Sequence, residues 1–200
     1  MIHRPFVFLD IETTGFGPDV ARVLEVGALR VENGQIVQKY QSLIYPESAV
    51  PSAITRLTGI TNDDVAGKPL FAGIAPALTD LLHGAIFVAH NVDFDYGFLQ
   101  AEYARLGARF DYDRLCTVRL SRALYPHERS HKLDSVIKRG GYQVTDRHRA
   151  LDDAEVLYKF FSDSHTAFGI ELFRHIDRLV TYTRTRNTAT IRRGSPTLPL

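Results

Sequence analysis

The sequence has almost no cysteine and no long apolar run. Cys116 is the single cysteine among 200 residues, which excludes an internal disulfide and a zinc site built on a cysteine pair. The apolar stretch behind the N-terminus reaches only to Asp10, which is too short for a signal peptide or a membrane span. We therefore expect a protein of a reducing compartment, cytoplasmic and without membrane contact.

Negative charge is nearly missing from the C-terminal segment. From Phe173 onward acidic residues become rare while arginines accumulate, namely Arg174, Arg178, Arg184, Arg186, Arg192 and Arg193. Residues 183–200 show no hydrophobic period, so we expect the tail to be partly disordered. A solvated linker is the simpler interpretation, and binding of a partner or of nucleic acid is the alternative.

The remaining composition is that of an ordinary folded domain. Apolar residues make up 44% of the chain, enough for one substantial core at this length. The net charge of +1 neither favours nor excludes nucleic acid as a partner, because acidic metal ligands could mask a basic rim in the sum. One domain is the default expectation.

Strand-like and helix-like segments alternate along the chain. Strands are predicted at residues 6–11, 23–31, 36–44, 86–89 and 115–117. Helices are predicted at residues 52–56, 62–65, 71–82, 91–106, 118–124, 133–139, 150–165 and 170–182. Asn33-Gly34 indicates a hairpin turn, and Asn91 resembles a helix-capping residue. The order βββαβαβα predicts an α/β fold with a mixed five-stranded sheet flanked by helices.

Three separate segments carry ionisable groups beside strongly apolar residues. They are residues 7–15 with Asp10 and Glu12, residues 90–95 with Asp95, and residues 148–153 with His148 and Asp153. The first two segments contain no lysine or arginine. Ionised carboxylates close to a core cost several kcal/mol unless a positive charge compensates them. Divalent cations would supply that charge.

Periodicity predicts which acids turn toward one another. Asp10 and Glu12 lie two residues apart on a strand and therefore share a face, an arrangement suited to a shared cation. On the helix predicted after Asn91, helical phase places Asp95 among the apolar side chains and Asp93 on the opposite side. Asp95 is therefore the candidate ligand, and Asp93 is expected to stabilise the helix N-terminus.

The third segment is interpreted in the same way. Asp153 lies near the buried arc of its helix, whereas Asp152 faces solvent and is expected to stabilise the helix N-terminus. A histidine such as His148 is more often a surface or core residue than a catalyst, but its place before a helix with an inward acid favours a role in the site. Glu25, inside an apolar run, stays open between structural hydrogen bonding and an outer role at the site.

The same segments resemble the motifs of a known enzyme family. The three motifs of the DEDDh 3'→5' exonucleases are similar, in order, to residues 8–15 (FLDIETTG), 90–95 (HNVDFD) and 148–153 (HRALDD). The proofreading exonucleases of bacterial DNA polymerase III, the epsilon subunit and its relatives, are also similar at residues 24–28 (LEVGA), 57–61 (LTGIT) and 130–135 (SHKLDS). The resemblance implies an RNase H-like fold, with an exonuclease domain at residues 1–170 and a basic C-terminal helix and tail at 171–200.

The resemblance also implies roles for the ionisable groups. Two divalent cations, Mg²⁺ or Mn²⁺, would be held by Asp10, Glu12, Asp95 and Asp153, with His148 as the general base. Two such ions can activate a water, neutralise the phosphate and stabilise the departing oxygen, and carboxylate oxygens suit them as ligands. Imidazole suits the base because it can be neutral near pH 7. The implied reaction releases nucleoside 5'-monophosphates from the 3' end of DNA, in proofreading or repair.

By the same resemblance, other residues would hold the terminal nucleotides. They are Thr13, Thr14 and Gly15 through backbone donors, Leu57 and Thr58 against the last base, and Asn91 with Phe94 beside the second nucleotide. The epsilon subunit often has histidine where Thr58 stands. Stacking on apolar walls tolerates any base sequence, which suits single-stranded or frayed 3' ends of DNA.

Two other functions stay open. The family includes trimmers of both DNA and RNA, so a 3'→5' exoribonuclease is one alternative. A non-catalytic nucleic-acid-binding module associated with a polymerase is the other, although the complete set of acids and histidine argues against it. A DNA polymerase subunit, bound through the C-terminal region, is a candidate partner.

Overall fold

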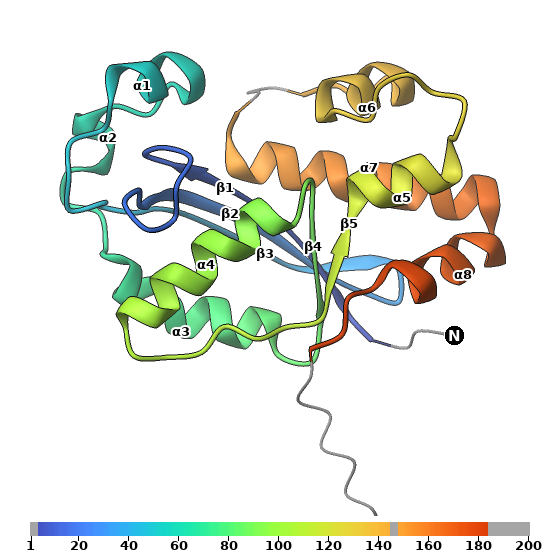
Figure 1. The fold of residues 1–200 in the computed structure, drawn as a ribbon, viewed down its shortest axis with the longest axis horizontal. Coiled ribbons are helices and arrows are strands. Elements are labelled where there is room, and N and C mark those ends of the chain that lie inside the picture. Colours follow the sequence, from blue (N-terminus) through green and yellow to red (C-terminus); the bar gives the residue numbers. More distant parts are fainter. Residues whose placement is uncertain (1–3, 145–147, 184–200) are drawn as a thin grey trace, which may run out of the picture.

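The computed structural model describes residues 4–144 and 148–183, which form one mixed sheet of five strands (Figure 1). The strands lie in the order β3-β2-β1-β4-β5. β2 is antiparallel to both β1 and β3, whereas β4 pairs with β1 and β5 pairs with β4 in parallel. Their bounds are β1 Phe6–Thr13, β2 Val23–Glu32, β3 Gln35–Leu43, β4 Ile86–Ala89 and β5 Arg114–Cys116. The predicted α/β fold with a mixed five-stranded sheet is confirmed.

Helices cover both faces of this sheet (Figure 1). One face carries α3 and α4, and the other carries α5, α6, α7 and α8. The bounds are α1 Ser52–Thr58, α2 Asn62–Val65, α3 Phe71–Leu82, α4 Asp93–Arg105, α5 Thr117–Leu124, α6 Leu133–Gly140, α7 Ala150–Phe168 and α8 Ile170–Leu179. Within the described residues, none of these helices is both long and apolar enough to cross a membrane.

The central strand β1 divides its side chains between the two layers. Val7 points into the core with α3 and α4. Phe6 and Phe8 lie on the α7 side, where their rings pack at 5.0 and 5.3 Å from the ring of Phe161. Because strand side chains alternate, Asp10 and Glu12 continue this second series. They therefore lie on the α7 face, just beyond the aromatic cluster.

The predicted hairpin and three predicted elements agree with the structure. Asn33 and Gly34 adopt φ values of 51° and 78°, as a two-residue turn with left-handed backbone requires. The elements α2, α3 and β4 have the predicted bounds. Their limits were predictable because a capping group, a proline or a glycine lies close to each of them.

Most other predicted ends differ from the structure by one to three residues, and two of these differences have a clear physical cause. Asn91 is not a helix cap, because α4 begins at Asp93 with Val92 at the N-cap, and Asn91 itself has a left-handed φ of 64°. The last helix was predicted to reach Tyr182 but ends at Leu179, since Thr181 instead forms a β-bridge with Arg114. The predicted tail from residue 184 onward lies outside the described residues.

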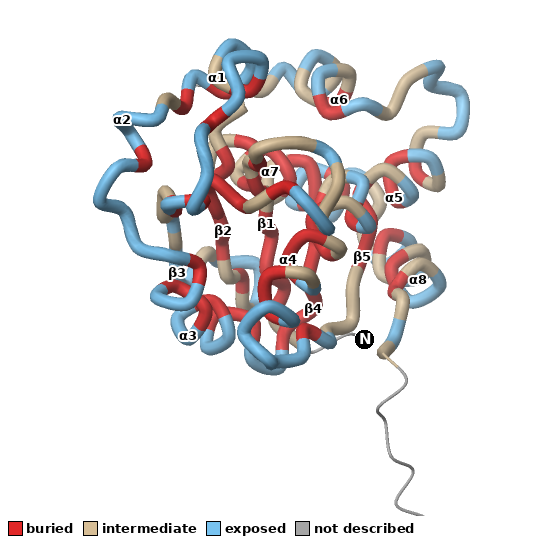
Figure 2. Tube along the Cα trace, turned by 60° about the vertical axis from the view of Figure 1, so that its left-hand side comes forward, coloured by how far each residue is buried: buried red, intermediate tan, exposed pale blue. Residues whose placement is uncertain are grey.

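The segment with α1 and α2 is a largely exposed excursion from the layers (Figure 2). A small apolar cluster of Leu24, Val50, Ile54, Ile60 and Val65 holds it to β2. Thr61 and Asp64 form a reciprocal capping box at the start of α2. The excursion stands at the same end of the sheet as α6 (Figure 1), which is the end where β1 finishes.

Candidate active site

One cavity brings together all five ionisable residues predicted for the site. Its volume is about 220 Å³, and its walls include Asp10, Glu12, Asp95, His148 and Asp153. They come from β1, from the first turn of α4 and from the start of α7. The predicted convergence of the three segments therefore takes place in the structure.

β1 supplies two carboxylates on one face, as predicted. In the antiparallel register Asp10 lies opposite Gly27 and Glu12 lies opposite Glu25. The register shifts directly after Glu12, between Glu12 and Thr13. Such irregularities re-aim side chains at strand ends, and here the shift lies directly beside Glu12, before the last pair of the ladder, Thr13 with Val23.

Three of the groups are close enough to bind one cation. Ligand atoms of Glu12, His148 and Asp153 all lie within 4.8 Å of one another. Asp153 is only 3% exposed, whereas Glu12 and His148 are half-buried. Carboxylate oxygens of this kind are the preferred ligands of Mg²⁺ and Mn²⁺. The donor set therefore fits a divalent cation, and the opening of the cavity leaves room for water or substrate oxygen.

Asp95 reaches the cavity from the opposite layer. β4 pairs with β1 only from Phe6 to Phe8, and beyond that point the Asp95 carboxylate accepts a hydrogen bond from the Ile11 N–H. Burial raises the pKa of Asp95 to about 8, although hydrogen bonds from the backbone N–H groups of Asp95 and Ile11 act in the other direction. A buried carboxyl of this kind needs a positive charge to be ionised at neutral pH. A cation at this site would supply it.

The start of α7 is fixed by an ion pair whose carboxylate is buried. Glu25, fully buried, accepts hydrogen bonds from Nε and Nη2 of Arg149 at 3.1 and 2.8 Å and from the Ala150 N–H at 3.1 Å. The Gln41 side chain donates a further bond at 2.9 Å. His148, the residue before Arg149, has a left-handed φ of 64°. Glu25 therefore has the structural hydrogen-bonding role considered from the sequence, and an outer role at the site stays a prediction.

Gly27 allows α7 to approach the sheet. A Cβ atom at this position would lie 2.1 Å from the Leu151 nitrogen and 2.2 Å from the Ala150 carbonyl carbon. Both neighbours are backbone atoms, which cannot swing aside. The absence of a side chain opposite Asp10 thus brings the first turn of α7, with Asp153, against the end of β1.

The two acids predicted to lie outside the site do so. Asp93 is exposed and forms ion pairs with Arg114 and Arg119 at 3.6 and 3.0 Å. Asp152 does not line the cavity, although it is half-buried rather than facing solvent fully. Helical phase therefore distinguished each ligand candidate from its acidic neighbour.

The residues predicted to bind nucleotides fall into two groups. Asn91 and Phe94 line the cavity. The Thr14 N–H donates to the Arg22 carbonyl at 2.9 Å, so it is not an available donor for a nucleotide. The Thr13 hydroxyl donates to the carbonyl of Gly15 at 2.6 Å. The contribution of this turn to substrate binding stays a prediction.

On α1 the two predicted residues differ in exposure. Leu57 is 47% exposed, as a residue that contacts a base should be. Thr58 is 5% exposed, and its hydroxyl donates to the Ile54 carbonyl at 3.0 Å and accepts from the Ile60 N–H at 3.1 Å. The Thr58 hydroxyl is thus used to end the helix, and a contact of Thr58 with the last base stays a prediction.

Besides Ile11, whose N–H binds Asp95, the cavity is lined by two residues for which no role was predicted from the sequence, His90 and Leu133. His90 shares a hydrogen bond of 2.9 Å between its Nδ1 and the Thr117 hydroxyl, and that hydroxyl also donates to the Ala89 carbonyl at 3.2 Å. Both residues belong to segments noted for their resemblance, which was the only signal that pointed to them.

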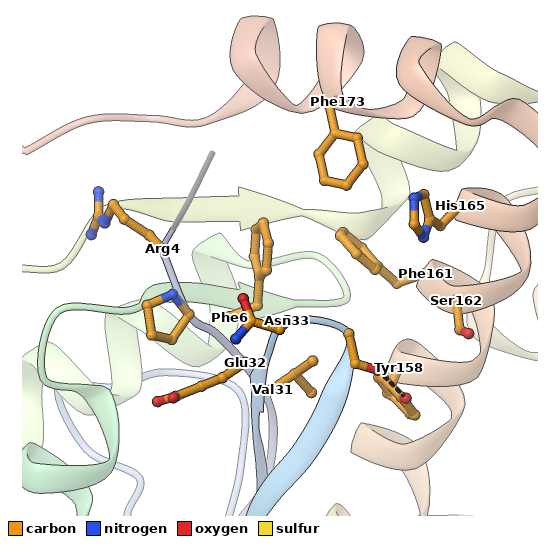
Figure 3. Close-up of a pocket in the computed structure, with 12 residues that line it drawn as sticks. Arg4, Phe6, Val31, Glu32, Asn33, Tyr158, Phe161, Ser162, His165 and Phe173 are labelled. Carbon is orange, nitrogen blue, oxygen red and sulfur yellow. Dashed lines mark hydrogen bonds between the residues drawn. The ribbon is translucent and has the colours of Figure 1, made fainter. Parts of the chain in front are cut away.

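A larger cavity lies at the other end of β1 and is unrelated to this chemistry. It measures about 430 Å³ and is walled by aromatic rings, among them Phe6, Phe161 and Phe173 (Figure 3). Tyr158 donates a hydrogen bond across it to the Gly34 carbonyl at 2.9 Å. None of the five ionisable residues of the candidate site lines it.

Comparison with known families identifies the family of this chain. The model of a family described as Exonuclease, RNase_T, matches residues 7–161. The chain belongs to this exonuclease family. The match includes β1, α4 and the first part of α7, and it confirms the resemblance that the three sequence motifs indicated.

Among curated relatives, the DNA polymerase III subunit epsilon of Aquifex aeolicus is 32% identical over 185 residues, which cover 90% of this chain and 91% of the relative. The DNA polymerase III PolC-type of Clostridium perfringens is 35% identical over 170 residues, or 85% of this chain. The 3'-5' exonuclease DinG of Bacillus subtilis is 38% identical over 158 residues, or 78% of this chain. The exonuclease chain spans only 12% and 17% of these last two relatives.

Solved structures of exonucleases have the same fold. Exonuclease X in complex with 5' overhanging duplex DNA gives a TM-score of 0.69 at 24% identity, covering 86% of this chain and 98% of that one. E. coli Exonuclease I in complex with a dT13 oligonucleotide gives a TM-score of 0.76 at 20% identity, covering 86% and 43%. The RNase H-like fold expected from the motifs is thereby confirmed.

Proposed function

We propose that this exonuclease is a metal-dependent 3'→5' enzyme of the DEDDh type that removes nucleoside 5'-monophosphates from the 3' end of DNA. The observation that carries the proposal is the convergence of four carboxylates and one histidine in a single cavity of about 220 Å³. Neither a structural role nor a passive binding role requires this set, because every buried acid adds an unfavourable desolvation energy.

The proposed site uses Asp10, Glu12, Asp95 and Asp153 as ligands of two divalent cations, Mg²⁺ or Mn²⁺. Bound cations would neutralise charge on the phosphate and lower the pKa of the attacking water. The donor chemistry and the clustering of Glu12, His148 and Asp153 within 4.8 Å support this assignment.

His148 is the proposed general base. Its side chain lies in the same cluster as Glu12 and Asp153, so a water held by those carboxylates would be within its reach. The ion pair between Glu25 and Arg149 fixes the backbone directly beside it. His148 would accept the proton of that water while the bond to the 3' oxygen breaks.

DNA is the proposed substrate, with single-stranded or frayed 3' ends as the reactive form. The relatives, among them subunit epsilon of DNA polymerase III, support DNA over RNA. Phe94, which lines the cavity, and the exposed Leu57 on α1 supply apolar surfaces for bases. Association with a DNA polymerase subunit, a place in proofreading or repair, and a cytoplasmic location belong to the same proposal.

The test measures shortening of a 3'-extended DNA strand, labelled at its 5' end, in Mg²⁺ or Mn²⁺, with EDTA as the metal-free control. We expect Asp153→Asn to lower kcat by at least about 10²-fold, because it removes a cation ligand. Asp152→Asn makes the same chemical change one residue away and should keep activity within about twofold. Equal activities for the two variants, or cleavage that persists in EDTA, would contradict the assignment.

A matched RNA strand decides the substrate. Faster removal of nucleotides from RNA than from DNA of the same sequence would replace the proposal by its alternative, a 3'→5' exoribonuclease. Binding of either strand without any cleavage would favour the non-catalytic nucleic-acid-binding module. Paired and mismatched DNA ends in the same assay report whether an unpaired terminus is preferred, as proofreading requires.

A further inference from the structure

A second cavity adjoins the candidate active site. It measures about 490 Å³ and shares the lining residues His90, Asn91 and Leu133 with the site cavity. Its other walls come from α5 and from the loop between α5 and α6. A molecule held at the carboxylates would therefore continue past Asn91 into this second space.

The walls of this second cavity are basic. Arg122, Arg129, His131 and Lys132 line it, and we call these four residues the basic groove. The two arginines and the lysine are exposed to solvent. No acidic side chain lines the groove among the residues that the structure describes.

Two nearby acids are paired with other cations. Asp93 pairs with Arg114 and Arg119, and Glu128 lies 4.0 Å from Arg139. In the described part of the chain, no ion pair joins a carboxylate to Arg122, Arg129 or Lys132. Three cations with no acidic partner among the described residues therefore face one cavity, which favours an anionic ligand.

The groove is held in place by a buried hydroxyl. Ser121, which is fully buried, shares a hydrogen bond of 2.8 Å with Nδ1 of His131 and accepts one of 2.9 Å from Arg139. The Arg139 guanidinium also lies over the ring of Tyr125, 4.5 Å from its centroid. These contacts tie α5, the loop and α6 together, so the ligand would not have to order the loop when it binds.

We propose that the basic groove binds the backbone phosphates of the nucleotides that precede the terminal one, so that the strand runs from the groove past Asn91 to the carboxylates. This inference rests on the proposed function and adds a subsite to it. Phosphate contacts position a strand without reading its sequence, which is what an enzyme that removes successive nucleotides requires.

The experiment measures kcat and KM of the wild-type enzyme and of each variant on two substrates, at the same metal concentration. One is a single-stranded oligonucleotide of about ten nucleotides, a length typical of single-strand grooves. The other is the 4-nitrophenyl ester of thymidine 5'-monophosphate, a phosphodiester with no preceding nucleotide. Arg122→Ala and Arg129→Ala should each raise KM for the oligonucleotide about tenfold and leave kcat and hydrolysis of the ester within about twofold.

Salt dependence gives a second readout. Each lost phosphate contact should reduce the slope of log KM against log salt concentration by about 0.7 for a single strand. Lys132→Ala should behave like the arginine variants. Arg109→Ala and Lys68→Ala remove exposed cations that line neither cavity, and they should change neither KM nor the slope.

The outcomes separate the two proposals. If wild-type enzyme hydrolyses neither substrate, the proposed function fails. If it hydrolyses both but the groove variants keep the wild-type KM and salt slope for the oligonucleotide, only the basic groove is refuted. Equal losses on the oligonucleotide and the ester would also refute it, because the effect would then lie at the reacting centre.

Discussion

Gly27→Ala tests whether the close approach of α7 to β2 sets the geometry of the site. The added Cβ would lie 2.1 Å from the Leu151 nitrogen, whereas ordinary contacts begin at 3.4 Å. The first turn of α7 must therefore move by about 1.3 Å relative to β2, the difference between these two distances. That turn carries Asp153, and His148 lies two residues before its first residue, Ala150.

The expected effects follow from this displacement. Overpacking a well-packed contact costs about 1–3 kcal/mol, which corresponds to a fall in Tm of about 2–12 °C for a chain of this size. A misplacement of about 1 Å in a catalytic group can lower the rate about 10²-fold. We therefore expect a folded, less stable enzyme whose kcat on a 3'-extended strand is reduced by about that factor.

Gly97→Ala is the matched control. Gly97 lies inside α4, and a Cβ atom there would have no neighbour within 4 Å. The same substitution should stabilise the protein by about 0.5–1 kcal/mol, since alanine favours the helix. Thermal unfolding and single-turnover cleavage measure both variants. Gly27→Ala with wild-type Tm and kcat would refute the reasoning.

Two further predictions concern buried charge. Glu25→Gln should destabilise the protein by about 1–3 kcal/mol, because a neutral amide with one acceptor oxygen cannot serve both the Arg149 guanidinium and the Ala150 N–H. The midpoint of urea unfolding measures this, and a change below about 0.5 kcal/mol would contradict it. The pKa of Asp95 is raised by burial to about 8, above its value near 4 in the unfolded chain. The folded state therefore holds this proton more tightly, so the stabilisation is complete below about pH 4 and is lost as pH rises through about 8. In EDTA, the midpoint of urea unfolding should therefore fall as pH rises over this range. Asp95→Asn should make the midpoint less dependent on pH. If this variant keeps the wild-type pH dependence, Asp95 is not the source of that dependence.

The fold could be predicted from the sequence where local signals decide it. The turn at Asn33-Gly34 and the limits of α2 and α3 depend on residues within one or two turns of the chain. Asn91 was misjudged because its preference for a cap and its tolerance of left-handed backbone are both local properties. The packing of β4 and α4 around it, which decides between them, is set by residues far away in the sequence.

The candidate site shows the same division. Helical phase was enough to separate Asp95 from Asp93 and Asp153 from Asp152, since orientation on a helix is a local property. The hydrogen bond from Arg149 to Glu25 joins residues 124 positions apart in the sequence. Gly27 and Leu151, which approach each other closely, are similarly far apart in the sequence. No periodicity within one segment reports such pairs, and Glu25 therefore stayed ambiguous until the fold was known.

Both ends of the described chain are tied to one residue at the edge of the sheet. Asp113 accepts hydrogen bonds from the Arg4 side chain and, at 2.7 Å, from the Thr183 N–H. It lies just before β5, and the other end of β5 leads to Thr117, which is hydrogen-bonded to His90 in the cavity wall. Arg4 and Thr183, the two ends of the described chain, therefore lie side by side. A domain whose two ends lie side by side can be inserted into a loop of a larger polypeptide.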